Sequence, residues 1–147
     1  MKIIFLAIVL LFLSKTSFAD IYNANSFKCD YYYVALGEIK NNKYKIETSK
    51  ENKMEFSYVN IDLNNGSAQM VGNGGTANVT AISGQPSGVH FVEMTSAGNL
   101  TMTTIYPQEI GYNSLGQKLF TSSHSRHMAM ISNSLPQQYY GQCALME

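Results

Sequence analysis

A succession of short segments rich in β-branched, aromatic and hydroxyl-bearing residues constrains the fold of this chain more than any other feature. Such segments favour strands, and no long window shows the apolar periodicity of an amphipathic helix. The predicted strands cover residues 27–35, 44–48, 54–63, 67–71, 77–83, 89–95, 100–106, 118–131 and 138–145. We therefore expect an all-β protein.

The links between these segments contain residues typical of turns, such as Asn-Asn-Gly at residues 64–66. Short links of this kind join neighbouring antiparallel strands as hairpins. The longest irregular link is expected at residues 107–117, and the charge-rich residues 38–55 are expected to form a solvated hairpin. The result is an antiparallel meander of about eight or nine strands, which buries one face either as an up-and-down β-barrel or as a β-sandwich.

The two cysteines, Cys29 and Cys143, lie near opposite ends of this strand-rich region. In an oxidising compartment an even pair is most simply a disulfide, whereas two cysteines with no histidine at ligand spacing make a poor zinc site. The bridge would join the first long strand to the last one. These strands are neighbours in a closed up-and-down barrel, so the cysteines favour the barrel over the sandwich.

The start of the chain has the layout of a secretory signal peptide. Lys2 provides a positive charge, and residues 3–13 form an unbroken apolar run. Ser17 and Ala19 are small residues at the −3 and −1 positions of a cut before Asp20. The apolar run is much shorter than the roughly 20 residues that cross a bilayer. We expect cleavage rather than a membrane anchor.

Removal of residues 1–19 would leave residues 20–147 as one domain, large enough for a core of its own. Ten basic residues then become eight, against ten acidic residues, because Lys2 and Lys15 leave with the signal. A slightly acidic chain lacks the basic surface that nucleic acids and anionic lipids attract. We expect a periplasmic or secreted protein with no nucleic-acid partner and no stable membrane anchor after cleavage.

Polar residues gather in the last two long predicted strands, most densely at residues 123–127. His124 and Arg126 share one face of their strand, because side chains alternate along a strand. Tyr139 lies on the neighbouring strand, and Glu93 is a candidate counter-ion for the arginine. A guanidinium group suits an anionic ligand and a structural polar network equally well. A polar network that holds the strands together is the favoured interpretation of this patch. The functional alternative is a small binding pocket for an anionic or hydroxylated molecule, formed by these four residues.

No catalytic, metal or cofactor motif stands out. Ser123 and His124 are adjacent on a strand and point to opposite faces, which prevents a hydrogen-bonded dyad. His124 and His127 also point to opposite faces, so they do not converge with His90 on a metal. The glycines at residues 72–75 lack the Lys-Ser/Thr pair and the helix of a phosphate-binding loop. No catalytic residue, metal site or cofactor is predicted, and a non-enzymatic role is favoured.

Segments 91–95, 103–106, 124–127 and 138–143 carry a pattern that ends in Ser-Arg-His and Gln-Tyr-Tyr-Gly-x-Cys. On these segments the chain resembles a family of small bacterial exported proteins of unknown activity. The resemblance covers most of the chain after the signal and implies a compact β-barrel-like domain. In overall plan alone, the chain is also similar to lipocalin-like and avidin-like barrels and to periplasmic lysozyme inhibitors.

Two function classes follow from these features. The first is an exported, non-catalytic barrel that binds a small ligand at the polar patch. The second is a protein-interaction module, such as an inhibitor of a periplasmic or secreted enzyme, that acts through an exposed loop such as residues 107–117.

Overall fold

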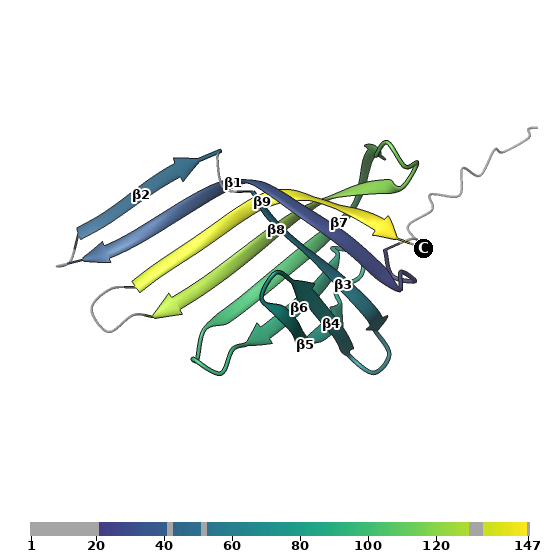
Figure 1. Ribbon diagram of the computed structural model, residues 1–147, viewed down its shortest axis with the longest axis horizontal. Coiled ribbons are helices and arrows are strands. Elements are labelled where there is room, and N and C mark those ends of the chain that lie inside the picture. The colour runs from purple at the N-terminus through teal and green to yellow at the C-terminus, as the bar shows by residue number, and fades with distance from the viewer. Residues whose placement is uncertain (1–20, 41–42, 51–52, 130–133, 147) are drawn as a thin grey trace, which may run out of the picture.

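The computed structural model describes residues 21–40, 43–50, 53–129 and 134–146. These residues form nine antiparallel strands (Figure 1), and none of them is helical. The strands are β1 (Ser26–Lys40), β2 (Lys43–Ser49), β3 (Met54–Asp62), β4 (Ser67–Gly72), β5 (Gly75–Ser83), β6 (Val89–Met94), β7 (Leu100–Tyr112), β8 (Lys118–Ala129) and β9 (Ser134–Met146).

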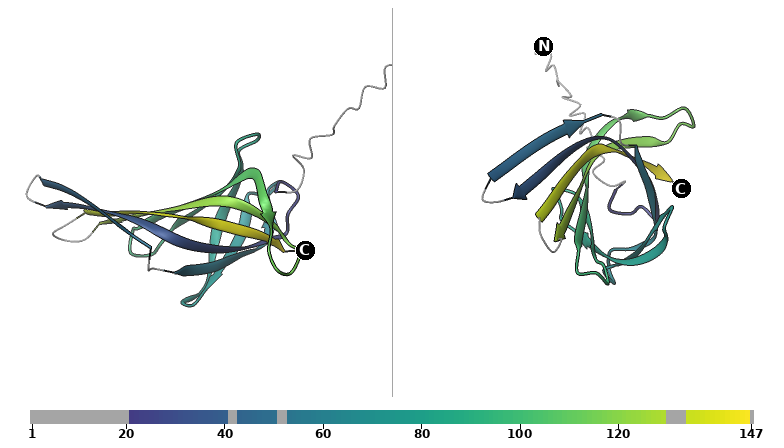
Figure 2. Two further views of the ribbon diagram at one scale, coloured as in Figure 1. Left: turned by 90° about the horizontal axis from the view of Figure 1, so that it is seen from above. Right: turned by 60° about the vertical axis from the view of Figure 1, so that its left-hand side comes forward.

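Eight of these strands, β1 and β3 to β9, close into a barrel (Figure 2). From β3 to β9 each strand pairs with the next one along the chain, and β9 returns to pair with β1. The ninth strand, β2, lies outside this ring and pairs with the C-terminal half of β1. The predicted all-β meander is thus confirmed, and it closes as a barrel rather than as a sandwich.

Aromatic side chains fill the interior of the barrel. In β3, Phe56 and Tyr58 are buried while the residues beside them are more exposed, which is the period of two expected for a strand with one inner face. The Tyr58 ring stacks on Phe91 with centroids 3.8 Å apart, and the Tyr31 ring stacks on Phe56 at 5.4 Å. Burial of each of these large side chains stabilises the fold by about 2–3 kcal/mol.

The disulfide lies where the barrel closes. Cys29 of β1 and Cys143 of β9 stand directly opposite each other in the register and are bonded, with no exposed surface on either residue. The predicted bridge is confirmed. It fixes the one strand pair of the barrel that joins the two ends of the chain.

The residues before β1 also belong to the core. Ile21 has only 1% of its surface exposed and Ala24 is buried as well. The backbone of Asn25 accepts a hydrogen bond from the N–H of Ile61 at 3.1 Å. A cut before Asp20, as the sequence predicts, would leave this packing intact.

The predicted loop at residues 107–117 is largely strand, so this expectation is wrong. Strand β7 continues to Tyr112, and β-bulges interrupt its pairing with β8 on either side of Glu109. A proline and a glycine are tolerated in a strand at such irregularities, which is how Pro107 and Gly111 fit here. The turn that follows is closed by Asn113, whose Oδ1 accepts hydrogen bonds from the N–H groups of Leu115 and Gln117 at 3.0 and 2.9 Å.

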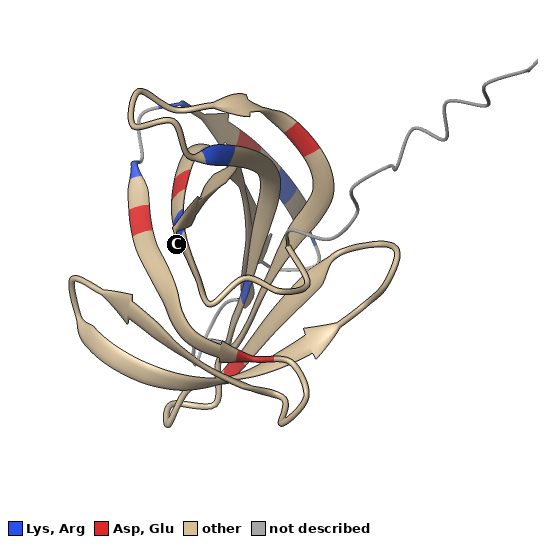
Figure 3. Ribbon diagram, turned by 90° about the vertical axis from the view of Figure 1, so that its right-hand side faces the viewer, with Lys and Arg blue, Asp and Glu red and all other residues tan. Residues whose placement is uncertain are grey.

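Charged residues are few and mixed in sign along the strands (Figure 3). The pairs that the structure shows lie at the surface, such as Lys28 with Glu55 at 2.7 Å and Lys45 with Glu47 at 2.5 Å. Exposed pairs of this kind contribute little to stability. The barrel is therefore held by its aromatic interior, its backbone ladders and its disulfide.

Candidate functional site

A cavity of about 670 Å³ opens at the end of the barrel where β3 begins and β4 ends. We call it the mouth cavity. Strands β3 and β4 and the turn after β4 form one wall, and β8 and β9 form the other. Its lining residues are Lys53, Met54, Glu55, Phe56, Met70, Gly72, Asn73, Arg126 and Tyr139.

Arg126 is the only arginine in the chain, and it stands on the wall of the mouth cavity. In the register of β8 it lies between Thr101 of β7 and Gln137 of β9. The side chain is partly buried, and it makes no hydrogen bond or ion pair with any residue that the structure describes. A partly buried cation without a partner is available to an anion that enters the cavity.

Glu93 lies two strands away from Arg126 on the inner face of the barrel, because Thr101 stands between them in the register. The hydroxyl of Thr101 donates a hydrogen bond to Glu93 Oε2 at 3.4 Å. Within the described chain, no ion pair joins Glu93 to Arg126. Glu93 is therefore not the counter-ion of this arginine, and the guanidinium keeps its hydrogen-bonding capacity.

Tyr139 is the second predicted residue that lines the mouth cavity. It is buried, and its hydroxyl donates a hydrogen bond to Gln137 Oε1 at 2.7 Å. It stands directly opposite His124 in the register of β8 and β9, with the two ring centroids 6.0 Å apart. The structure therefore brings Arg126, Tyr139 and His124, three of the four residues of the expected patch, together on the inner face of one hairpin.

His124 belongs to a buried chain of hydrogen bonds. The Tyr58 hydroxyl donates to Thr103 Oγ1 at 2.6 Å, and Thr103 Oγ1 lies at hydrogen-bonding distance, 2.7 Å, from His124 Nδ1. Burial, together with the positive charge of Arg126, lowers the pKa of His124 to about 4.

A parallel chain lies beside it. The Ser122 hydroxyl donates to the backbone oxygen of Thr104 at 2.9 Å, so the Tyr31 hydroxyl is the donor in its 2.8 Å contact with Ser122. Burial raises the pKa of both Tyr31 and Tyr58 above their usual value. Both tyrosines remain protonated and satisfied, which makes this network a structural one.

The buried histidine predicts a pH-dependent stability. In the unfolded chain the pKa of His124 returns to its usual value of about 6.5, so the unfolded state binds the proton first as the pH falls. The free energy of unfolding should therefore fall between pH 6.5 and pH 4, by at most about 3 kcal/mol, and the loss from this group should level off below pH 4. Urea denaturation across this range measures the effect.

The matched variants for this measurement are His124→Gln and His127→Gln. His127 sits three residues along β8 and is exposed. His127→Gln should keep the wild-type slope of stability against pH, and His124→Gln should flatten it. Equal slopes in the wild type and in His124→Gln would assign the effect to other groups.

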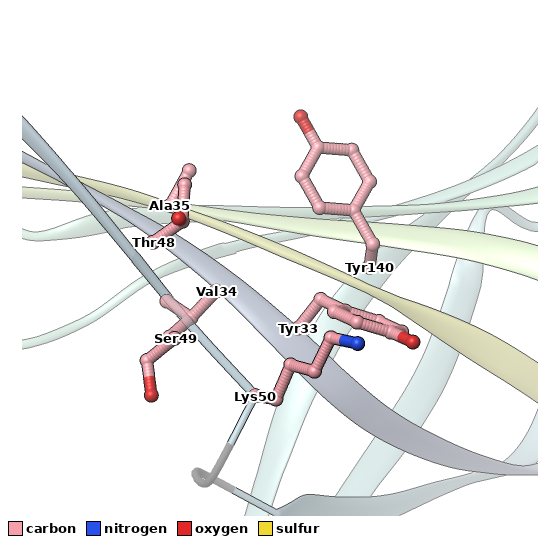
Figure 4. Close-up of a pocket in the computed structure, with 7 residues that line it drawn as sticks. All are labelled: Tyr33, Val34, Ala35, Thr48, Ser49, Lys50 and Tyr140. Carbon is pink, nitrogen blue, oxygen red and sulfur yellow. The ribbon is translucent and has the colours of Figure 1, made fainter.

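A second, smaller cavity of about 390 Å³ lies on the outside of the barrel, beside β2 (Figure 4). The exposed rings of Tyr33 and Tyr140 stand opposite each other in the register of β1 and β9 and form part of its wall. Lys50 places its Nζ 5.3 Å from the centre of the Tyr33 ring. The cation of this outer cavity thus already has an aromatic partner, unlike Arg126.

Sequence reasoning missed the opposite wall of the mouth cavity, formed by Met54, Phe56 and Met70. Their inward alternation along β3 and β4 is visible in the sequence. What brings them across from Arg126 is the closure of the barrel, which pairs strands that are distant in the chain.

Among the described residues, no group of three or more histidine, cysteine, aspartate or glutamate side chains is arranged to hold a metal ion. No helix in that part of the chain is long and apolar enough to cross a membrane. Comparison of the chain with protein-family models, with curated proteins and with solved structures finds no match. The family resemblance drawn from sequence segments therefore stays a prediction.

Proposed function

We propose that this protein is an exported, non-catalytic β-barrel that binds a small molecule with an anionic group and an apolar body in the mouth cavity. The proposal rests on the partial burial of Arg126 without a partner among the described residues. Partial burial of a charged group is costly unless that group is paired, and the described chain offers Arg126 no partner. A carboxylate, sulfonate or phosphate can accept two parallel N–H···O hydrogen bonds from the guanidinium group.

The rest of the cavity supports an apolar body for the ligand. Met54, Phe56 and Met70 present apolar surface opposite the arginine. Lys53 adds a second cation at the rim, but its Nζ already lies 3.1 Å from Glu55 and 3.7 Å from Asp30. The volume is within the range of about 300–1,000 Å³ that is usual for small-molecule sites.

Export is the second part of the proposal, with residues 1–19 as a cleaved signal and the periplasm or the medium as the destination. A buried disulfide is typical of proteins in oxidising compartments. Ile21 is buried in the core, so the packed part of the chain reaches to within two residues of the expected cut before Asp20. The intact mass of the protein purified after expression of the full chain in a bacterium tests whether it starts at Asp20.

The alternative is a protein-interaction module such as an enzyme inhibitor. One observation favours it: Leu115, in the turn between β7 and β8, is 80% exposed, and Tyr112 at the end of β7 is 60% exposed. Apolar side chains at an exposed turn suit a protein partner. Under this alternative, Leu115→Ser abolishes the interaction and Arg126 has no part in it.

The ligand proposal predicts that the wild type binds anilinonaphthalene sulfonate, an apolar fluorophore with one sulfonate group, and that dodecanoate displaces it. Arg126→Gln should weaken this binding at least about tenfold, because a charge-assisted hydrogen bond contributes about 1.5–3 kcal/mol. A fluorescence titration of the folded protein measures both affinities.

Lys50→Gln is the matched control, because it removes one positive charge from the outer cavity and leaves the mouth cavity unchanged. This variant should bind the fluorophore as the wild type does. Thermal unfolding of Arg126→Gln checks that its fold is retained. A wild type that binds neither probe, or an Arg126→Gln variant that binds both equally well, would falsify the proposal. Lower stability with unchanged binding would leave Arg126 with a structural role only.

A further inference from the structure

Strand β2 presents an edge that no other described strand covers. It pairs with β1 on one side, and the strand order of the sheet ends at β2. Residues 43–48 are exposed along this edge, and Tyr44 and Ile46 have 80% and 77% of their surface in solvent. An open edge with exposed apolar side chains is a template for pairing with a further strand.

We propose that β2 pairs antiparallel with β2 of a second copy of this chain, about a two-fold axis that passes beside Ile46. In this register Ile46 faces Ile46 of the partner subunit. Lys45 stands opposite Glu47 of the partner subunit, and Glu47 stands opposite Lys45 of the partner subunit. The sequence of this edge is therefore self-complementary in charge, as an isologous contact requires.

The charges also select this register over its neighbours. An axis moved by one residue to Lys45 would set that lysine against the same residue of the second copy, although Lys43 would then stand opposite Glu47 of the partner subunit. An axis moved to Glu47 would set the carboxylate of Glu47 against that of Glu47 of the partner subunit. The axis at Ile46 gives the two opposite-charge pairs without such a like-charge pair. Like charges directly opposite each other destabilise a strand pair, and opposite charges stabilise it, so the axis at Ile46 is favoured.

The separate subunit already holds Lys45 and Glu47 together. Their ion pair has an Nζ–Oε1 distance of 2.5 Å, with 67% and 60% of the two side chains exposed. Because alternate residues share a face, both point to the side of β2 opposite to Tyr44 and Ile46. Pairing would place this ion pair beside the same pair of the second copy, so that four charges of alternating sign form a square on one face. The exposed apolar side chains of the two copies would come together on the other face.

A contact of one strand is small beside the roughly 1,200–2,000 Å² of a stable interface. We therefore expect a weak, concentration-dependent dimer rather than a permanent one. Sedimentation equilibrium of the disulfide-bonded wild type over a wide concentration range should show exchange between monomer and dimer.

Charge variants test the register itself. Lys45→Glu sets carboxylates against each other across the axis and should weaken association at least about tenfold. The double variant Lys45→Glu/Glu47→Lys has the net charge of the wild type and restores opposite charges across the axis, so it should dimerise again. Thermal unfolding confirms that each variant is folded.

A wild type that stays monomeric at the highest concentrations overturns the proposal and leaves the edge to a strand of a different protein. A dimer that Lys45→Glu does not weaken, or that the double variant does not restore, overturns the proposed register. Neither outcome depends on the mouth cavity, because Lys45 and Glu47 do not line it.

Discussion

Loss of the Cys29–Cys143 disulfide is expected to lower the free energy of unfolding by about 5 kcal/mol. The two residues are 114 positions apart in the sequence, so the bridge removes a large amount of conformational freedom from the unfolded chain. It also joins β1 to β9, the strand pair through which the barrel closes. This is the largest single effect that we expect, since an ordinary domain is stable by only about 5–15 kcal/mol.

Urea denaturation with and without a thiol reductant measures this effect. The sulfur atoms are fully buried, so the reductant must be present during equilibrium unfolding rather than added to the folded protein. Cys29→Ala/Cys143→Ala should unfold at the low denaturant concentration of the reduced wild type, and the reductant should not change its midpoint. If the reductant leaves the urea midpoint of the wild type unchanged, the pairing of β1 with β9 is sufficient to hold the barrel closed without the disulfide.

Gly141→Ala should destabilise the protein by about 4 kcal/mol, at the upper end of what overpacking costs. Gly141 lies on β9 opposite Tyr31, next to the irregularity in β1 between Tyr31 and Tyr33. An added Cβ would collide with the backbone oxygen of Asp30 and would stand only 2.7 Å from the Tyr31 Cα. Backbone atoms of a paired strand cannot move aside as a flexible side chain can, so β1 and β9 would have to separate beside the disulfide.

Gly74→Ala is the matched control, because an added Cβ at that turn meets no atom within 4 Å. Its midpoint of urea denaturation should stay close to that of the wild type. If Gly141→Ala unfolds at the same urea concentration as Gly74→Ala, the close approach of the two backbones is not a constraint on the fold.

Alternation along the strands allowed part of the site to be predicted from the sequence. His124 and Arg126 share a face, and Tyr139 joins them because β8 and β9 form a hairpin in which His124 and Tyr139 are directly opposite. Such local pairing follows from the order of residues. Which face points inward did not follow, because both faces of β8 mix polar and apolar groups, and only closure of the barrel buries one of them.

The parts that could not be predicted depend on long-range pairing or on irregular strands. The prediction that Glu93 is the counter-ion of Arg126 was wrong, because Thr101 of β7 lies between the two residues in the register. The Thr101 hydroxyl donates its hydrogen bond to the Glu93 carboxylate. The expected loop at residues 107–117 failed because Pro107 and Gly111 are usually strand breakers. The bulges of β7 accommodate both residues, and no simple sequence pattern predicts a bulge.

The pairing of β1 with β9 also sets the timing of folding. The first strand of the barrel can complete its ladder only when the last one arrives, so the ring stays open until almost the whole chain has been made. For an exported chain, Cys29 would cross the membrane before Cys143 does. It would remain a free thiol until the last strand has also crossed. Contacts between distant parts of a chain form slowly. Slow closure would keep the polypeptide unfolded inside the cell, in the state that translocation requires, and the barrel would close only after export.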